Sequence, residues 1–240
     1  MRHEIRFAAG GSVPPLKTQP NLTERVYQQI LSDIVEGELP ESARLIQDDL
    51  ARDLGVSRQP VQQALLLLRN QGFVRDAPGR GLEVAPIDTD FIRNLYEIRA
   101  VAEGLACRLA ASRGAERAAE QGPRLIAEGR RAEREHSVEQ LIEADVKFHE
   151  FLYQVSGNSV IQDTTQPHWL HLRRLMGEVL MRDETPRRIW DQHEDILNAV
   201  IAGDAQRAED LARQHITRTA TVLLARLSKQ RDRVPVATPS

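Results

Sequence analysis

The 240-residue sequence has little cysteine, few aromatic residues and no long apolar run, and each shortage excludes a class of protein. A single cysteine, Cys107, cannot form a disulfide framework. Aromatic residues make up only 4% of the chain, so the 41% of hydrophobic residues must build aliphatic cores, which suits helices. The longest apolar run, residues 64–68, is far shorter than the roughly 20 residues needed to span a bilayer. The charged N-terminus lacks the apolar segment of a signal peptide, so we expect a cytoplasmic protein with no membrane partner.

The chain also lacks the excess of positive charge that is typical of nucleic-acid-binding proteins, because its net charge is −3. Residues 56–82 are an exception, with four arginines and a single aspartate. Any DNA-binding face must therefore be local, and we expect its non-specific affinity for DNA to be modest.

That basic stretch and the residues before it have the pattern of a winged helix-turn-helix. The apolar spacing predicts helices over residues 22–36, 46–54 and 58–71, each followed by a glycine. Ser57 is a natural N-cap for the third helix, and Pro60 fits its first turn. Two short strands at residues 73–74 and 82–84, joined by a Pro-Gly-Arg-Gly turn, would then form the wing.

The third helix has the polar N-terminal end of a recognition helix. Such an end enters the major groove, where arginine can pair with guanine and glutamine with adenine. Arg80, between two glycines, can reach the minor groove or a phosphate. Each polar residue taken alone fits an ordinary solvated surface as well, but their order favours a DNA-binding module. The candidate DNA contacts are Arg44, Ser57, Arg58, Gln59, Gln62, Gln63, Arg80 and Gly81.

The composition and the periodicity divide the chain into four regions. Residues 1–20 are rich in glycine and proline and predict a flexible arm, residues 21–86 contain the winged helix-turn-helix, and residues 231–240 predict a flexible tail. Residues 87–230 have helical periodicity throughout. The predicted helices of this region are 90–113, 115–134, 138–155, 159–182, 187–202 and 205–228. The expected fold class is mainly α, with an N-terminal winged helix-turn-helix and a C-terminal all-α bundle.

Three of these predicted helices each direct one histidine inward. Asp145 and His149 are four residues apart and share a helix face, whereas His193 and His215 each lie among apolar residues. Burying several polar rings costs free energy unless each has a partner, and a divalent metal would satisfy all four side chains at once. Imidazole and carboxylate ligands fit Zn, Ni, Mn or Fe without singling one out. The spacing is equally compatible with hydrogen-bonded histidines in an ordinary core.

The two halves of the chain resemble two known domains. Residues 22–84 resemble the DNA-binding domain of the GntR family of bacterial transcriptional regulators. Residues 90–228 resemble the effector-binding FCD domain of its FadR-like branch. The motifs that carry the resemblance are Gly55-Val56-Ser57-Arg58-x-Pro60-Val61, Tyr96-Glu97-Ile98-Arg99-x-x-x-Glu103, Asp145-x-x-x-His149, Ser156-Gly157-Asn158 and the later His193 and His215.

This resemblance implies a homodimeric, ligand-responsive transcriptional regulator, most often a repressor, that reads a short pseudo-palindrome in double-stranded DNA. In the metal-binding members an aspartate and three histidines in this order hold a divalent ion. The set carries over here to Asp145, His149, His193 and His215. A small carboxylic acid would occupy the open coordination positions of that ion as the effector.

The candidate effector contacts have ordinary alternatives. Arg99 is a good partner for a carboxylate, but it could instead pair with Glu103 one helical turn away. Asn158 fits a helix cap better than a ligand contact, and Trp190 could wall the cavity. The candidate effector contacts are Arg99, Asn158, Arg173, Arg174 and Trp190.

Two positions depart from the GntR pattern. Gln62 stands where the family usually has arginine, and Asp48 lies where basic side chains are usual. We therefore expect an unusual operator, with adenine favoured over guanine at the base that Gln62 contacts.

Two other functions fit the same residues. The four metal ligands could form the site of a metal-dependent enzyme, although no general acid or base stands out beside them. The metal could also be purely structural in a DNA-binding dimer. We predict a regulator and not an enzyme.

Overall fold

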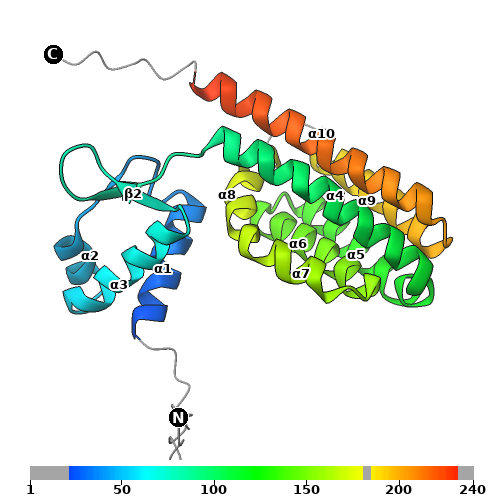
Figure 1. Cartoon of the computed structure of the whole chain (residues 1–240), viewed down its shortest axis with the longest axis horizontal. Helices are drawn as coiled ribbons and strands as arrows, with labels where there is room; N and C mark the ends of the chain where they lie inside the picture. The colour runs from blue at the N-terminus through cyan, green and yellow to red at the C-terminus, as the bar shows by residue number, and fades with distance from the viewer. Residues whose placement is uncertain (1–21, 181–184, 232–240) are drawn as a thin grey trace, which may run out of the picture. The chain divides into compact units, whose positions relative to one another are not determined.

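The computed structural model describes residues 22–180 and 185–231. They form two compact units: the first consists of residues 22–34 and 39–85, and the second of residues 35–38 and the chain from Pro86 onwards (Figure 1). The fold is mainly α, as predicted. The predicted arm, and all of the predicted tail except residue 231, lie outside the described residues.

The first unit contains three helices and three short strands. They are α1 (Leu22–Glu36), β1 (Arg44–Leu45), α2 (Gln47–Asp53), α3 (Arg58–Asn70), β2 (Val74–Asp76) and β3 (Leu82–Val84). The apolar face of α3 is fully buried, with Val61, Leu65 and Leu68 at 0% exposure. Gly55 has φ +65°, a backbone conformation that side chains strain, so the turn between α2 and α3 requires a glycine here.

The wing is a three-stranded antiparallel sheet in the order β1-β3-β2, with Leu45 opposite Leu82 and Val74 opposite Val84. The two-strand prediction missed β1, because two residues cannot show an alternating pattern and their pairing with β3 is long-range. The predicted capping role of Ser57 is also not seen. The residue occupies the N-cap with extended backbone, but its side chain makes no capping hydrogen bond.

The second unit is a helical bundle. Its elements are α4 (Thr89–Arg113), α5 (Ala115–Glu135), α6 (Val138–Ser156), α7 (Ser159–Thr165), the 3-10 turn η1 (Gln166–His168), α8 (Trp169–Leu180), α9 (Thr185–Ile201) and α10 (Ala205–Arg231). The single helix predicted over 159–182 is divided, with Pro167 in the 3-10 turn between α7 and α8. In Figure 1, α10 runs along α4, and the two helices pack together over much of their length.

Two glycines of α5 bring α9 close. A Cβ at Gly129 would lie 2.0 Å from the ring of Trp190, and one at Gly122 would lie 2.4 Å from Leu197. Trp190 and Leu197 lie on either side of His193 along α9, so the close approach fixes the depth of that histidine in the core. The bundle thus directs α4, α6, α9 and α10 toward one buried polar centre.

Candidate metal centre and nucleic-acid interface

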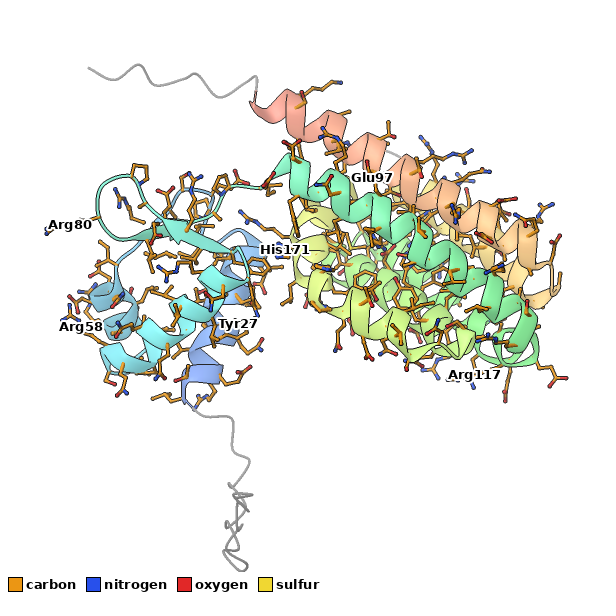
Figure 2. All side chains as sticks on the ribbon, viewed as in Figure 1. Tyr27, Arg58, Arg80, Glu97, Arg117 and His171 are labelled. Carbon is orange, nitrogen blue, oxygen red and sulfur yellow. The ribbon has the colours of Figure 1, made fainter. Side chains whose placement is uncertain are left out.

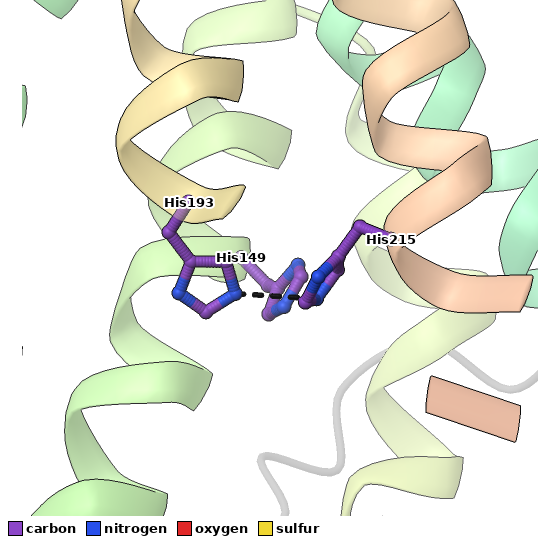
Figure 3. Close-up of side chains that lie close together, drawn as sticks. All are labelled: His149, His193 and His215. Carbon is purple, nitrogen blue, oxygen red and sulfur yellow. Dashed lines mark hydrogen bonds between the residues drawn. The ribbon is translucent and has the colours of Figure 1, made fainter. Parts of the chain in front are cut away.

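Three histidines from three helices meet inside the bundle. His149 lies on α6, His193 on α9 and His215 on α10, and each is at most 4% exposed. One nitrogen of each ring lies within 4.8 Å of a nitrogen of the other two (Figure 3). Nε2 of His193 is 3.2 Å from Nε2 of His215. This cluster has the residue types and the spacing of a site that can bind a metal ion.

Asp145 stands beside the three histidines, one turn before His149. Its Oδ1 is 3.5 Å from Nε2 of His193, and its Oδ2 is 3.7 Å from Nε2 of His149. Burial raises the pKa of this carboxyl, although His149 and Arg99 oppose the shift. The four residues predicted as metal ligands therefore lie together, with three imidazole nitrogens and one carboxylate directed to the same place.

The second nitrogen of two of the rings indicates which of their nitrogens points inward as a lone pair. Nδ1 of His215 is 2.8 Å from the side-chain oxygen of Gln192, and Nδ1 of His149 contacts Oε2 of Glu103. An oxygen acceptor at Nδ1 requires a proton there, which leaves Nε2 as a lone pair. Nε2 of His215 hydrogen-bonds to Nε2 of His193 across this dry core, and a cation between the two rings would replace that bond.

The buried polar atoms of this centre are also incompletely satisfied. Among the described residues, Oδ2 of Asp145, Nδ1 of His193 and both ring nitrogens of His149 are buried without an aligned hydrogen bond. Such atoms are rare in folded proteins and point to a missing partner such as an ion. The donor set and the orphaned atoms both fit a divalent metal.

Two of the three histidines, His193 and His215, are in the protonation state that a metal requires. Burial, with a further contribution from His149, lowers the pKa of His215 to about 3. Burial likewise holds the pKa of His193 well below its usual range. Both rings are therefore neutral at physiological pH and can donate a lone pair to a metal without first losing a proton.

Arg99 and Glu103 form a buried ion pair beside His149. Nε of Arg99 is 2.6 Å from Oε1 of Glu103, and their side chains are 4% and 2% exposed. Burial disfavours the charged carboxylate of Glu103, but Arg99 and His149 outweigh it and lower its pKa to about 2. The Arg99 guanidinium also lies over the ring of Trp169, 4.9 Å from its centroid. Arg99 thus makes the contact with Glu103 that the sequence left as an alternative.

A small pocket opens beside the metal candidates, with a cavity volume of about 20 Å³. This is room on the order of one or two water molecules. Its described lining residues are Tyr96, Arg99, Asp145, His149, Met176, Ile189, His215, Ile216 and Thr219. Arg99 is the one predicted effector contact in that lining.

The other four predicted effector contacts are not among the described lining residues of that pocket. Trp190 is 1% exposed, with its ring edge-on to His193 at 4.8 Å between centroids. Asn158 accepts a hydrogen bond from the backbone N–H of Val160 at 3.2 Å and so caps α7. Arg173 is exposed on α8 and Arg174 is half-buried there.

Sequence reasoning assigned no role to several residues of this centre, among them Gln192 and Thr219. Gln192 precedes His193 on α9 yet contacts His215 of α10, and no pattern along the chain indicates that contact. Thr219 lines the pocket one turn after His215, a spacing that could have indicated it.

The candidate DNA contacts lie at the surface of the first unit. Arg58, Gln59 and Gln62 are exposed along the N-terminal half of α3, and Arg80 is exposed at the turn of the wing. Figure 2 labels Arg58 and Arg80 at the surface of this unit. Gln63 is exposed too, but its side-chain oxygen accepts a hydrogen bond from the Thr23 hydroxyl at 2.8 Å.

Two of the candidate arginines are engaged within the protein. Arg58 forms an ion pair with Asp48 of α2, in which the two side chains are 68% and 58% exposed. Arg44 donates hydrogen bonds to the backbone carbonyls of Pro78 and Arg80, the first at 2.8 Å, and so holds the turn of the wing. Gly81, the last candidate, has φ +95° in this turn.

Comparison with known proteins identifies the family. Residues 22–84 match the model of bacterial regulatory proteins of the gntR family, and residues 94–218 match the FCD domain. The chain belongs to the GntR family of transcriptional regulators, with an FCD domain. The DNA-binding winged helix-turn-helix and the FCD bundle were both predicted from the sequence.

The curated relatives are regulators as well. The chain is 29% identical over 221 residues to the uncharacterized HTH-type transcriptional regulator BphR of Paraburkholderia xenovorans, covering 90% of each protein. It is 28% identical over 205 residues to the HTH-type transcriptional repressor RspR of Escherichia coli K12, covering 84% of this chain and 90% of RspR. These relatives are transcriptional regulators and not enzymes, as predicted for this chain.

Solved structures share the fold. Escherichia coli McbR/YncC superposes with a TM-score of 0.69 at 21% identity, covering 86% of this chain and 99% of that one. A GntR transcriptional regulator from Rhodococcus sp. RHA1 superposes with a TM-score of 0.68 at 22% identity, covering 85% of this chain and 97% of that one.

Within the residues that the structure describes, every helix is too short or too polar to cross a bilayer.

Proposed function

We propose that this GntR/FCD protein is a cytoplasmic repressor whose FCD domain holds a divalent metal at Asp145, His149, His193 and His215. The observation that carries the metal site is the set of three buried Nε2 atoms and one carboxylate that face one another. The repressing mode is supported by one relative, RspR, which is named a repressor. When bound, the metal would supply a Lewis-acidic centre that attracts an anionic ligand.

The effector in this proposal is a small carboxylic acid that enters the pocket beside the metal. Two features support it. The pocket is lined by Arg99, a guanidinium that pairs well with carboxylates, and by the candidate ligands Asp145, His149 and His215. The small cavity suits a compact acid whose carboxylate fills it while the rest of the molecule extends toward the opening. Arg173, Arg174, Asn158 and Trp190 are secondary candidates.

The DNA-reading role falls to the N-terminal half of α3 and to the wing. We assign base contacts to Arg58, Gln59 and Gln62, which are exposed on one helix end. Arg80 at the turn of the wing would enter the minor groove or bind a phosphate. The other candidates are in supporting positions: Ser57 and Gln63 flank the reading face, and Arg44 and Gly81 shape the wing.

We propose that the functional unit is a homodimer, because a single winged helix would read too few bases for specific binding. Ile98 and Val101 on α4 are 62% and 52% exposed and lie one turn apart. Two copies could bury these side chains against each other. Replacing both with aspartate should give a monomer by sedimentation, with the FCD fold and the metal content retained.

The first experiment combines metal analysis with site selection on purified full-length protein. Elemental analysis should find one divalent ion per chain, and genomic fragments selected by the loaded protein should share a short palindrome. Affinity for that palindrome should fall steeply as salt rises. An adenine opposite the position of Gln62 would support its base contact, whereas guanine there would contradict it.

The same preparation separates the sensing role from a structural metal. A screen of small carboxylic acids should raise the melting temperature of the loaded protein and change its affinity for the palindrome. If no acid does either while chelation still lowers the melting temperature, the metal is structural and the sensing part of the proposal is wrong. Turnover of an acid would instead favour a metal-dependent enzyme.

A further inference from the structure

Glu103 is a buried carboxylate that the metal site and the DNA-binding unit leave without a function. Its two oxygens have different neighbours. Oε1 is 2.6 Å from Nε of Arg99, one turn earlier on α4, and Oε2 contacts Nδ1 of His149 on α6. The side chain is 2% exposed, so it gains no stabilisation from water. A buried charge of this kind is costly unless specific partners hold it.

The contact with His149 is on the side of the ring opposite to the candidate metal. Nε2 of His149 faces Asp145 at 3.7 Å, and Nδ1 faces Glu103. Histidine ligands of metals almost always donate their other ring N–H to a carboxylate or carbonyl, which fixes the tautomer and makes the ligand more basic. Neither nitrogen of His149 has an aligned hydrogen bond in the described residues, but Nδ1 and Oε2 are already in contact.

We propose that Glu103 is a positioning residue, an inference that rests on the proposed metal site. Its carboxylate accepts a hydrogen bond from Nδ1–H of His149 and so presents Nε2 of that ring to the metal, while Arg99 holds the carboxylate in place. His215 has the neutral counterpart, the side-chain oxygen of Gln192 at 2.8 Å from Nδ1. The motif Arg99-x-x-x-Glu103 is thereby assigned to the metal centre, although neither residue is a ligand.

The substitution Glu103→Gln tests this role at the level of single protons. Arg99 can only donate, so it will draw the amide oxygen toward itself and turn the amide NH₂ toward His149. Nδ1 of His149 must then accept, which moves the ring proton to Nε2 and blocks the metal lone pair. We expect the metal affinity, measured by competition with a chromophoric chelator, to fall by about 10- to 100-fold.

A spectroscopic measurement separates positioning from simple loss of stability. Ring ¹⁵N shifts of the metal-free protein should show His149 protonated on Nδ1 in the wild type and on Nε2 in Glu103→Gln. The matched control is Glu83→Gln, which removes another buried carboxylate, 5% exposed, from its ion pair with Arg75 in the first unit. That control should leave both the tautomer and the metal affinity unchanged.

The result that would overturn the proposal is a wild-type His149 protonated on Nε2. Because this measurement is made on the wild type, it does not depend on whether a variant folds. A folded Glu103→Gln with wild-type tautomer and metal affinity would overturn it equally. The outcome is distinct from failure of the proposed function. If the wild type binds no metal, the function fails, whereas the tautomer of His149 still tests the contact with Glu103.

Discussion

Arginine–carboxylate pairs occur in both units of this protein, but in opposite surroundings. In the DNA-binding unit, Arg58 and Asp48 are 68% and 58% exposed, whereas in the FCD bundle Arg99 and Glu103 are 4% and 2% exposed. An exposed pair contributes little to stability and can exchange one partner for another, such as a phosphate. A buried pair is strongly destabilising to break. The surface unit is therefore suited to transient recognition, and the buried centre to holding a fixed set of ligands.

The largest effect should come from removing the proposed metal or one of its ligands, because the buried centre has polar atoms without an aligned hydrogen bond that a cation would satisfy. His193→Ala should abolish stoichiometric binding of divalent metal. Saturating metal should raise the stability of the wild type by about 4 kcal/mol at 1,000 times the Kd. Calorimetry with and without chelator measures this difference.

The control for that experiment is His136→Asn, since His136 is an exposed histidine with a left-handed backbone (φ +52°) that asparagine tolerates. It should keep full metal binding. A melting temperature that chelation leaves unchanged in the wild type would contradict the buried metal site, and the comparison between the two units would lose its basis.

The second effect in size concerns the packing that places His193. Gly129→Ala puts a Cβ 2.0 Å from the Trp190 ring, so we expect a destabilisation of about 1–3 kcal/mol from overpacking. Gly104→Ala is the matched control in another helix of the same unit, because the three atoms nearest to its Cβ would all belong to the side chain of Arg213, which is 45% exposed and can move. Denaturant unfolding followed by far-UV circular dichroism compares the two.

Gly129→Ala should also weaken metal binding, because Trp190 lies edge-on to His193 and would push it from its place. Equal stability of the two alanine variants would show that α9 is not held at this depth by the glycine, and the rigid character assigned to the buried centre would have to be revised.

What the sequence could predict follows the same division between local and long-range contacts. Gly55 and Pro60 report local backbone requirements, so the helix-turn-helix was predictable from them. His149 shares a face with Asp145 by helical geometry alone. The strand β1 and the contact of Gln192 with His215 depend on segments brought together by the fold, and no periodicity along the chain encodes them.

The third prediction addresses the exposed unit. Arg58→Ala should cost about 1–3 kcal/mol of binding to the selected palindrome and relax the preference at one base pair. Arg80→Ala, if it removes a phosphate contact, should instead weaken binding to all sequences and lower the salt slope by about 1. Fluorescence anisotropy over a range of salt concentrations distinguishes the two, and Arg117→Ala, an exposed arginine of α5, is the control that should change neither. Loss of metal from any of these three variants would show that the metal centre depends on the exposed arginines, contrary to the contrast drawn between the two units.

The smallest effect should come from Asp48, and it reports directly on the exposed ion pair. Before Arg58 can contact DNA, it must leave Asp48, which then remains near the phosphates as an unpaired negative charge. Asp48→Asn removes both costs, so it should tighten DNA binding by about 0.2–1 kcal/mol, the usual strength of an exposed pair. The gain should be clear at 50 mM salt and shrink at 200 mM, because salt screens both the ion pair and the repulsion. Weaker binding of Asp48→Asn to the palindrome, with unchanged binding to unrelated DNA, would show that Asp48 orients Arg58 toward its base. Asp48 would then hold Arg58 in a fixed position, as Arg99 holds Glu103 in the buried pair.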